Sequence, residues 1–187
     1  MYPASFEYHK ATSVQDALAL LAKYGDDAKL LAGGHSLIPV MKLRFASPAH
    51  LIDIARIPAL STITDAGSAV HLGATARHAD VASSAVVRGK APLLAEVAGH
   101  IGDPLIRNMG TIGGSLAHGD PGADLPAAAL ALGATLVATG AGGSRSIAAD
   151  DFFTDVFSTA LQPGEILTDF FIQGGTVSRV VVGQLFD

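Results

Sequence analysis

The sequence predicts an α+β fold built as two lobes. Helix-like and strand-like segments are mixed along its 187 residues without the strict alternation that produces a doubly wound parallel sheet. Pro58 and the polar stretch 61–68 separate a short first part from a longer second part. Each part contains a glycine pair, Gly33-Gly34 in the first and Gly113-Gly114 in the second, that follows apolar residues and leads to a hydroxyl residue. These features favour two lobes with one glycine segment in each.

The small lobe is expected over residues 1–57 and is of α/β type. Ser13 is a suitable N-cap, and apolar residues between positions 14 and 22 recur at helical spacing. Gly25 predicts the end of this helix. The other expected elements are strands at 28–32 and 50–54, with a short helix between them at 36–44.

The larger α+β lobe is expected over residues 58–173, and a divergent tail over residues 174–187. Pro92 is favourable in the first turn of a helix. Gly142-Gly143 lies between two strand-like segments and most simply forms a hairpin turn. The expected strands are 69–74, 134–139, 145–148 and 166–172, and the expected helices are 78–84, 92–100 and 126–132.

Composition and charge exclude several classes of function. The net charge is -5 and the twelve basic residues are scattered, which argues against a nucleic-acid interface. The chain contains no cysteine, so it cannot itself ligate an iron–sulfur cluster through thiolates. The first ten residues lack the features of a secretory signal, and the most apolar window, 125–138, is too short and too interrupted to form a transmembrane segment. We therefore expect a cytoplasmic protein.

The stretch 107–126, RNMGTIGGSLAHGDPGADLP, carries the strongest chemical signal. Glycine lacks a Cβ atom, so a ligand can approach its backbone amide closely. Successive free amides in such a turn form a concave set of donors suited to an anion. Thr111 and Ser115 add hydroxyl groups, and Asp124 adds an acceptor for a sugar hydroxyl or, equally, a cap for the helix that follows it. These groups together suggest a nucleotide-type ligand, and the segment at 32–36, AGGHS, is built on the same plan.

Other nucleotide, hydrolase and metal motifs do not match. The sequence has no GxxxxGK[ST] motif, and the G-x-G at Gly140 lacks the last glycine of a Rossmann fingerprint. Gly34-His35-Ser36 resembles the start of a nucleophile elbow, but Ile38 occupies the position of the closing glycine. The seven histidines show no HxxxH or HxxEH spacing, so no metal site and no catalytic residue is predicted.

The segments AGGHSLIPVMKLR, from Ala32, and RNMGTIGGSLAHGDPGADLPAA, from Arg107, resemble the FAD-binding medium subunit of molybdenum hydroxylases. The resemblance is to the carbon monoxide dehydrogenase medium-chain type, which is related to the flavin domain of xanthine dehydrogenase. It covers the chain from Met1 to about Ile172, including GAT at 73–75 and PGEIL at 163–167. It implies the two-lobed flavin fold of the vanillyl-alcohol oxidase and p-cresol methylhydroxylase type, with FAD held between two lobes.

The resemblance also implies the roles of particular residues. The first pyrophosphate segment would be formed by Ala32, Gly33, Gly34, His35 and Ser36. The second would be formed by Thr111, Ile112, Gly113, Gly114 and Ser115. Asp124 would bind a hydroxyl of the ribityl or ribose portion, and Leu167 would lie near the flavin ring.

The function that the resemblance implies is electron transfer within a hetero-oligomer. A molybdopterin large subunit would hydroxylate the substrate, and [2Fe–2S] clusters in an iron–sulfur small subunit would relay the electrons. The present chain would accept these electrons at FAD and pass them to an external acceptor.

The C-terminal sequence departs from the family pattern. Family members continue into a C-terminal α/β domain, preceded by an aromatic and basic stretch that contacts the flavin. The present chain has QGGTVSRVVVGQLFD at 173–187 instead, so we expect a truncated member that lacks this domain. Two alternatives stay open: a lobe that keeps the fold but binds FAD weakly or not at all, and a stand-alone flavin oxidase.

Overall fold

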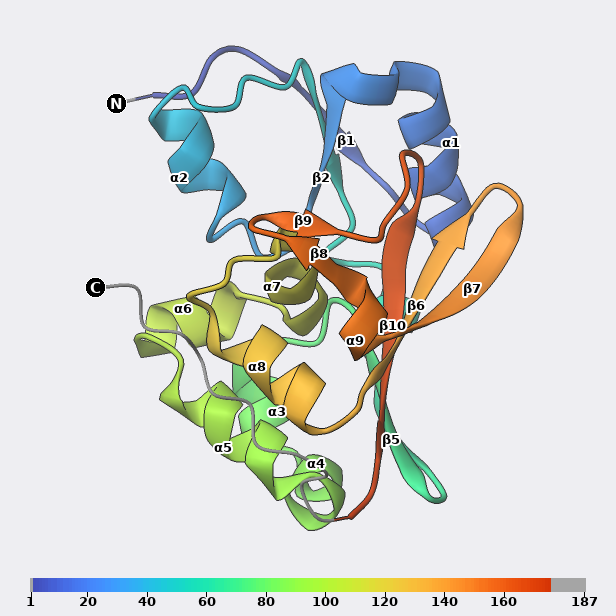
Figure 1. The fold of residues 1–187 in the computed structure, drawn as a ribbon. Coiled ribbons are helices and arrows are strands. Elements are labelled where there is room, and N and C mark those ends of the chain that lie inside the picture. The colour runs from blue at the N-terminus through green and yellow to red at the C-terminus, as the bar shows by residue number, and fades with distance from the viewer. Residues whose placement is uncertain (1, 176–187) are drawn as a thin grey trace.

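Two β-sheets organise the protein, one in each part of the chain (Figure 1). The computed structural model describes residues 2–175. The predicted tail at 174–187 therefore lies, from residue 176 onward, outside the described residues. The first sheet has three strands in the order β1-β3-β2, and the second has five in the order β4-β5-β10-β6-β7.

The small sheet is parallel throughout. Its strands are β1 (Glu7–Lys10), β2 (Ala28–Leu31) and β3 (His50–Asp53). Helix α1 (Val14–Tyr24) and a 3₁₀ turn, η1 (Gly25–Asp27), connect β1 to β2, and α2 (Leu37–Lys42) lies between β2 and β3. The predicted helix, strands and connecting helix of this region are thus confirmed, and β1 is an element that the sequence did not predict.

The beginning of α1 follows directly from its capping residues. The Ser13 hydroxyl accepts a hydrogen bond from the Asp16 amide at 3.1 Å, which satisfies a backbone donor that the first turn leaves unpaired. The Asp16 carboxylate reaches back and accepts from the Thr12 amide at 2.9 Å. At the other end, the Gly25 amide donates to the Leu21 carbonyl and the helix stops there.

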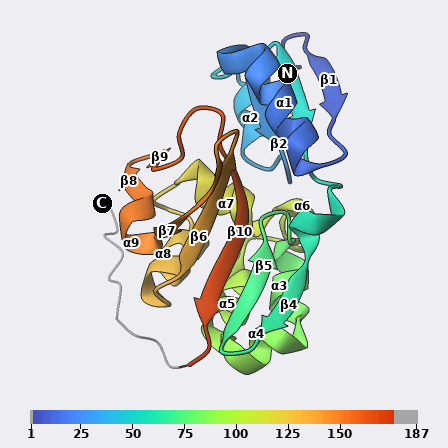
Figure 2. The ribbon, with the colours of Figure 1, turned by 90° about the vertical axis from the view of Figure 1, so that its right-hand side faces the viewer.

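The large sheet is antiparallel, and helices cover one of its faces (Figure 2). Its strands are β4 (Ile63–Ala66), β5 (Ala69–Gly73), β6 (Thr135–Gly140), β7 (Gly143–Ala148) and β10 (Ile166–Gln173). The helices are α3 (His78–Ser83), α4 (Ala85–Lys90), α5 (Pro92–His100), α6 (Pro104–Met109), α7 (Ile112–His118) and α8 (Asp124–Ala131). Shorter elements complete this part: the 3₁₀ turn η2 (Pro58–Ser61), α9 (Ala149–Phe152), β8 (Phe153–Asp155) and β9 (Ser158–Thr159).

Two local predictions for this region were wrong. The polar stretch 61–68, expected to separate the lobes, instead forms β4 and the turn into β5 at the edge of the large sheet. The segment 111–115, expected to be an open glycine loop, is the N-cap and first turn of α7. The predicted boundary between Ile57 and Pro58 stays a prediction.

The first residues of β10 join the cores of the two parts. Successive side chains of a strand point to opposite faces. Ile166 accordingly packs with the apolar core around Ile52 of the small sheet, whereas Leu167 belongs to the core beneath the large sheet, and both are at least 95% buried. Strand β10 therefore fixes how the two sheets lie relative to each other. Within residues 2–175 no helix has the length and apolar character needed to cross a bilayer.

Candidate functional site

The two glycine segments meet at their backbones. If Gly33 carried a Cβ atom, that atom would lie 2.3 Å from the Met109 carbonyl oxygen and 2.8 Å from the Gly110 Cα atom. Distances this short leave no room for a side chain. Since Thr111 follows Gly110 directly, the structure brings the first predicted segment against the start of the second.

The first segment offers a row of unused backbone donors. The amides of Gly33, Gly34, His35 and Ser36 make no hydrogen bond with any part of the chain that the structure describes. Gly34 has a φ of 75°, a left-handed conformation that is strained for other residues, and its carbonyl accepts from the Ile38 amide at 3.0 Å. Ala32 is half-buried against the small core, while His35 and Ser36 are exposed. This geometry suits an anion.

The second segment differs from the open row of amides that its sequence suggested, because its donors are already paired. The Ile112 and Gly113 amides donate to the carbonyls of Ala76 and Ala74 at 2.9 and 2.8 Å. The Gly114 amide donates to the Thr111 hydroxyl at 3.2 Å, and the Ser115 amide to the Thr111 carbonyl at 3.0 Å.

Exposure separates the residues of this segment into two groups. Thr111, Ile112 and Gly113 are buried, and the Ile112 side chain belongs to the large core. Gly114 is exposed and Ser115 is half-buried. A ligand can therefore reach this segment at the backbone of Gly114 and at the Ser115 hydroxyl.

The segment 73–77 holds the second glycine segment in place, a role that no local pattern of residues predicted. Besides accepting from Gly113, Ala74 donates its own amide to the Thr168 carbonyl of β10 at 2.9 Å. Arg77 pairs with Thr111 in an isolated antiparallel bridge, and its side chain is exposed. Arg77 is thus a cationic residue beside the second segment. The GAT motif at 73–75 was the available signal, but nothing in the sequence indicated which segment it contacts.

His78 is a buried histidine beneath the point where the segments meet. Its backbone amide donates to the Gly110 carbonyl at 3.0 Å, and its ring packs against Gly110. Burial, and secondarily the charge of the nearby His35, lowers the pKa of His78 from 6.5 to about 4, so its ring is neutral at neutral pH. Two buried polar atoms here, Nδ1 of His78 and Oγ1 of Thr75, have no hydrogen-bond partner within the described residues.

Two predicted site residues lie outside these contacts. Asp124 is the first residue of α8 and is exposed, and its carboxylate makes no hydrogen bond within the described residues. It does not cap its own helix, because the N-cap position belongs to Ala123. Leu167 is 5% exposed and faces the large core from β10.

A shallow groove of about 570 Å³ lies away from both glycine segments. It is lined by Gly67, Ser68, Gly89, Lys90, Pro92, Leu93, Leu132, Gly174 and Gly175. It contains none of the predicted site residues.

Known proteins of one family resemble this chain over most of its length. Residues 4–172 match the profile of the family described as the FAD binding domain in molybdopterin dehydrogenase. The carbon monoxide dehydrogenase medium chain of Hydrogenophaga pseudoflava is 51% identical over 178 residues, which make up 93% of this chain and 62% of the relative. The 6-hydroxypseudooxynicotine dehydrogenase complex subunit alpha of Paenarthrobacter nicotinovorans is 43% identical, over 90% of this chain and 57% of the relative.

Solved structures share the fold as well. Carbon monoxide dehydrogenase from Hydrogenophaga pseudoflava, in a form that lacks the Mo-pyranopterin moiety, superposes with a TM-score of 0.92 at 50% identity. The match covers 94% of this chain and 61% of that one. Quinoline 2-oxidoreductase from Pseudomonas putida superposes with a TM-score of 0.90 at 34% identity. The predicted fold class is confirmed, and the chain spans about three fifths of the length of these relatives.

Proposed function

The chain belongs to the family of FAD-binding domains in molybdopterin dehydrogenases, and we propose that it serves as the electron-transferring flavin subunit of a molybdenum hydroxylase. The family confirms both the resemblance and the cofactor, FAD, that the sequence predicted. The relatives are medium chains and FAD subunits of dehydrogenases, so the activity proposed for the whole protein is that of an oxidoreductase.

The observation that carries this proposal is the row of free amides at 33–36, whose first residue, Gly33, lies against the backbone of Met109 and Gly110. A diphosphate is a doubly charged acceptor, and an array of backbone donors can hold it without a lysine. Gly114 and the Ser115 hydroxyl would complete the pyrophosphate site from the second segment. The remaining predicted contacts are Asp124, toward a sugar hydroxyl, and Leu167, near the flavin ring.

Within the complex, the chain would accept electrons from [2Fe–2S] clusters on a partner subunit and deliver them to an external acceptor. When bound, the isoalloxazine ring supplies the redox chemistry, while the protein contributes position and electrostatics. These 187 residues contain no cysteine, so they cannot themselves ligate such clusters through thiolates. We therefore propose an iron–sulfur small subunit and a molybdopterin large subunit as partners in a cytoplasmic hetero-oligomer.

Substrate choice is proposed to lie outside this chain. The relatives carry names that refer to substrates as different as carbon monoxide, glyceraldehyde and caffeine. These substrates have no common chemistry that a single flavin subunit would recognise. A substrate-binding role for a separate large subunit accounts for this variety.

Titration of the purified, untagged chain with FAD tests the proposal. We expect one FAD per chain, seen as a change in flavin fluorescence, and competition by ADP but not by riboflavin, because the amides recognise the diphosphate. A folded, colourless chain that shows no saturable FAD binding would support the alternative of a lobe that has lost the cofactor. Reduction of bound FAD by an organic substrate, without partner subunits, would instead support a stand-alone oxidase.

The partner assignment has a separate test. Purification of the chain from its native source should bring with it a cysteine-rich polypeptide and a molybdopterin-containing one. Isolation of the chain alone, with full dehydrogenase activity, would contradict the proposed assembly.

A further inference from the structure

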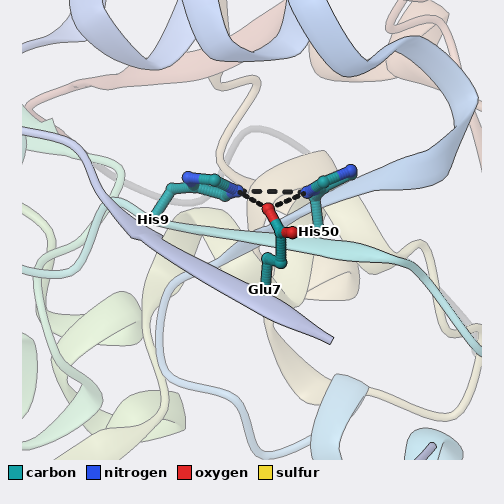
Figure 3. A group of neighbouring side chains, drawn as sticks. All are labelled: Glu7, His9 and His50. Atoms are coloured by element: carbon teal, nitrogen blue, oxygen red, sulfur yellow. Dashed lines mark hydrogen bonds and ion pairs between the residues drawn. The ribbon is translucent and has the colours of Figure 1, made fainter. Parts of the chain in front are cut away.

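A group of three potential metal ligands lies on one face of the small sheet (Figure 3). Glu7 and His9 are two residues apart on β1, so their side chains point to the same side of the sheet. His50 begins the neighbouring strand β3, and its Cα pairs directly with that of Glu7. The pairing register therefore brings two imidazoles and a carboxylate together from distant parts of the sequence.

The distances between these groups fit a shared cation. Nε2 of His9 lies 3.1 Å from Nδ1 of His50. One carboxylate oxygen of Glu7, Oε2, lies 3.4 Å from the His50 nitrogen and 3.8 Å from the His9 nitrogen. With metal–nitrogen bonds of about 2.0–2.1 Å, two nitrogens 3.1 Å apart subtend roughly 100° at the metal, which lies between octahedral and tetrahedral geometry.

Neighbouring side chains pack against the imidazoles of His9 and His50, whereas the carboxylate of Glu7 is exposed. The Tyr24 ring, at the end of α1, stacks on both, with centroids 4.8 Å from His9 and 3.8 Å from His50. The histidine side chains are about one fifth exposed, whereas the Glu7 side chain is 71% exposed and its carboxylate makes no hydrogen bond within the described residues. Lys23 is a nearby cation, and its ammonium lies 4.7 Å from the Tyr24 centroid.

This group lies apart from the flavin site. His50 and Glu7 stand at the first residues of β3 and β1, whereas the first glycine segment follows the last residue of β2, and all three strands are parallel. The four residues of β2 separate the two ends of the sheet by about 13 Å at 3.3 Å per residue. The histidines therefore lie at the opposite end of the small sheet from the first glycine segment.

We propose that Glu7, His9 and His50 form a binding site for a divalent transition metal of the Zn²⁺ class. Two neutral imidazoles and one carboxylate suit Zn²⁺, Co²⁺ or Ni²⁺, whereas Mg²⁺ and Ca²⁺ prefer sites made of oxygen alone. Three protein ligands leave positions for water. The metal would tie the edge strand β1 to β3 and so stabilise the small lobe. No metal site was predicted from the sequence, because the ligands come from two strands 41 residues apart at His9 and His50 and follow no local spacing motif.

Competition between the untagged, metal-free chain and a chromogenic chelator for Zn²⁺ tests the site. We expect one Zn²⁺ per chain, with affinity lowered on the order of 100-fold in His50→Gln and about tenfold in the exposed variant Glu7→Gln. His100→Gln, at an exposed histidine on α5, is the matched control and should bind as the parent does. Zn²⁺ at 100 times the parent's Kd should also raise the Tm by about 5 °C or more in the parent and the control, by about half as much in Glu7→Gln, and by little in His50→Gln.

The outcomes separate metal binding from a mere change in folding. Glu7→Gln should unfold at the parent's temperature in the presence of a chelator, since the carboxylate is exposed, and should still lose Zn²⁺ affinity. Co²⁺ added to the parent should give visible ligand-field bands that His50→Gln lacks. Equal Zn²⁺ affinities for the parent, Glu7→Gln and His50→Gln would overturn the site and leave a histidine–histidine hydrogen bond beside a surface carboxylate.

Discussion

Gly33 and Met109 lie so close together that a methyl group on the first would stand 2.3 Å from the carbonyl oxygen of the second. Gly33 follows β2 of the small sheet and Met109 ends α6, and the two residues lie in the two segments that carry the family resemblance. Their contact is one of backbone against backbone, which makes it sensitive to a single added carbon atom. It is therefore the point at which the pairing of the lobes can be tested.

Gly33→Ala should separate the two segments. The added Cβ meets backbone atoms on Met109 and Gly110, which cannot move aside as a flexible side chain could. We expect a loss of about 1–3 kcal/mol in the free energy of unfolding and at least a tenfold loss of FAD affinity. Gly142→Ala, where a Cβ would meet nothing within 4 Å, is the control. Denaturant unfolding measures the loss of stability, and FAD titration measures the loss of affinity. An unchanged FAD affinity would show that Gly33 is not part of the FAD site.

Gly114→Val should remove FAD binding while leaving most of the fold. Gly114 is exposed, but a Cβ there would lie 2.7 Å from the Thr111 hydroxyl that caps α7, so we expect a stability cost of about 1 kcal/mol. The branched side chain would also cover the surface at which a phosphate would meet the backbone. Gly89→Val, in open space on α4, is the control for a β-branched residue in a helix. If Gly114→Val binds FAD as the parent does, the second segment does not contact the cofactor.

Asp124→Asn should weaken FAD binding less than Gly114→Val. The carboxylate is exposed and makes no hydrogen bond within the described residues, so stability should change little. Asparagine keeps a neutral acceptor for a sugar hydroxyl but loses the charge, so affinity should fall by a few-fold to about tenfold, which corresponds to about 0.5–1.4 kcal/mol. Asp151→Asn, in the first turn of α9, is the matched control. Equal affinities for Asp124→Asn and Asp151→Asn would remove Asp124 from the site.

Local signals in the sequence predicted much of the fold. The Ser13 cap and the apolar spacing placed α1, and Gly142-Gly143 placed the hairpin of β6 and β7. In these elements the structure follows from neighbouring residues alone. Strand β1 was not predicted because its sequence, EYHK, is polar and lies at a sheet edge, where no alternation with a buried face marks it.

The local structure of the site was harder to predict because distant contacts decide it. Two adjacent glycines favour a loop over a helix. Pairing with the carbonyls of Ala74 and Ala76 nevertheless fixes the start of α7 at Ile112 and Gly113. The contact of Gly33 with Met109 and the burial of His78 arise in the same way. Resemblance to a family named the site residues, but it could not show which amides are already paired.

His78 should make the stability of the protein depend on pH. Its pKa is about 4 in the folded chain and near 6.5 when unfolded, so between these values the unfolded chain binds more protons. The stabilising contribution is therefore complete above about pH 6.5 and is lost progressively as the pH falls toward 4, by at most about 3 kcal/mol. Denaturant unfolding between pH 4 and 6.5 should show that the free energy of unfolding of His78→Phe depends less on pH than that of the parent. This comparison holds whatever the absolute stability of the variant. Parallel curves for the two proteins would show that folding does not lower the pKa of His78.

Ile166→Ala should weaken FAD binding although Ile166 is not one of the predicted site residues. Ile166 is 1% exposed and packs from β10 into the small core, so truncation should cost about 2–5 kcal/mol and loosen the attachment of one lobe to the other. Ile172→Ala is the matched control, because that residue is also fully buried on β10 but belongs to the large core. We expect similar losses of stability in the two variants but lower FAD affinity only in Ile166→Ala, since a diphosphate held from both lobes depends on their separation. If both variants keep the parent's FAD affinity while losing stability, the cofactor is held by one lobe alone.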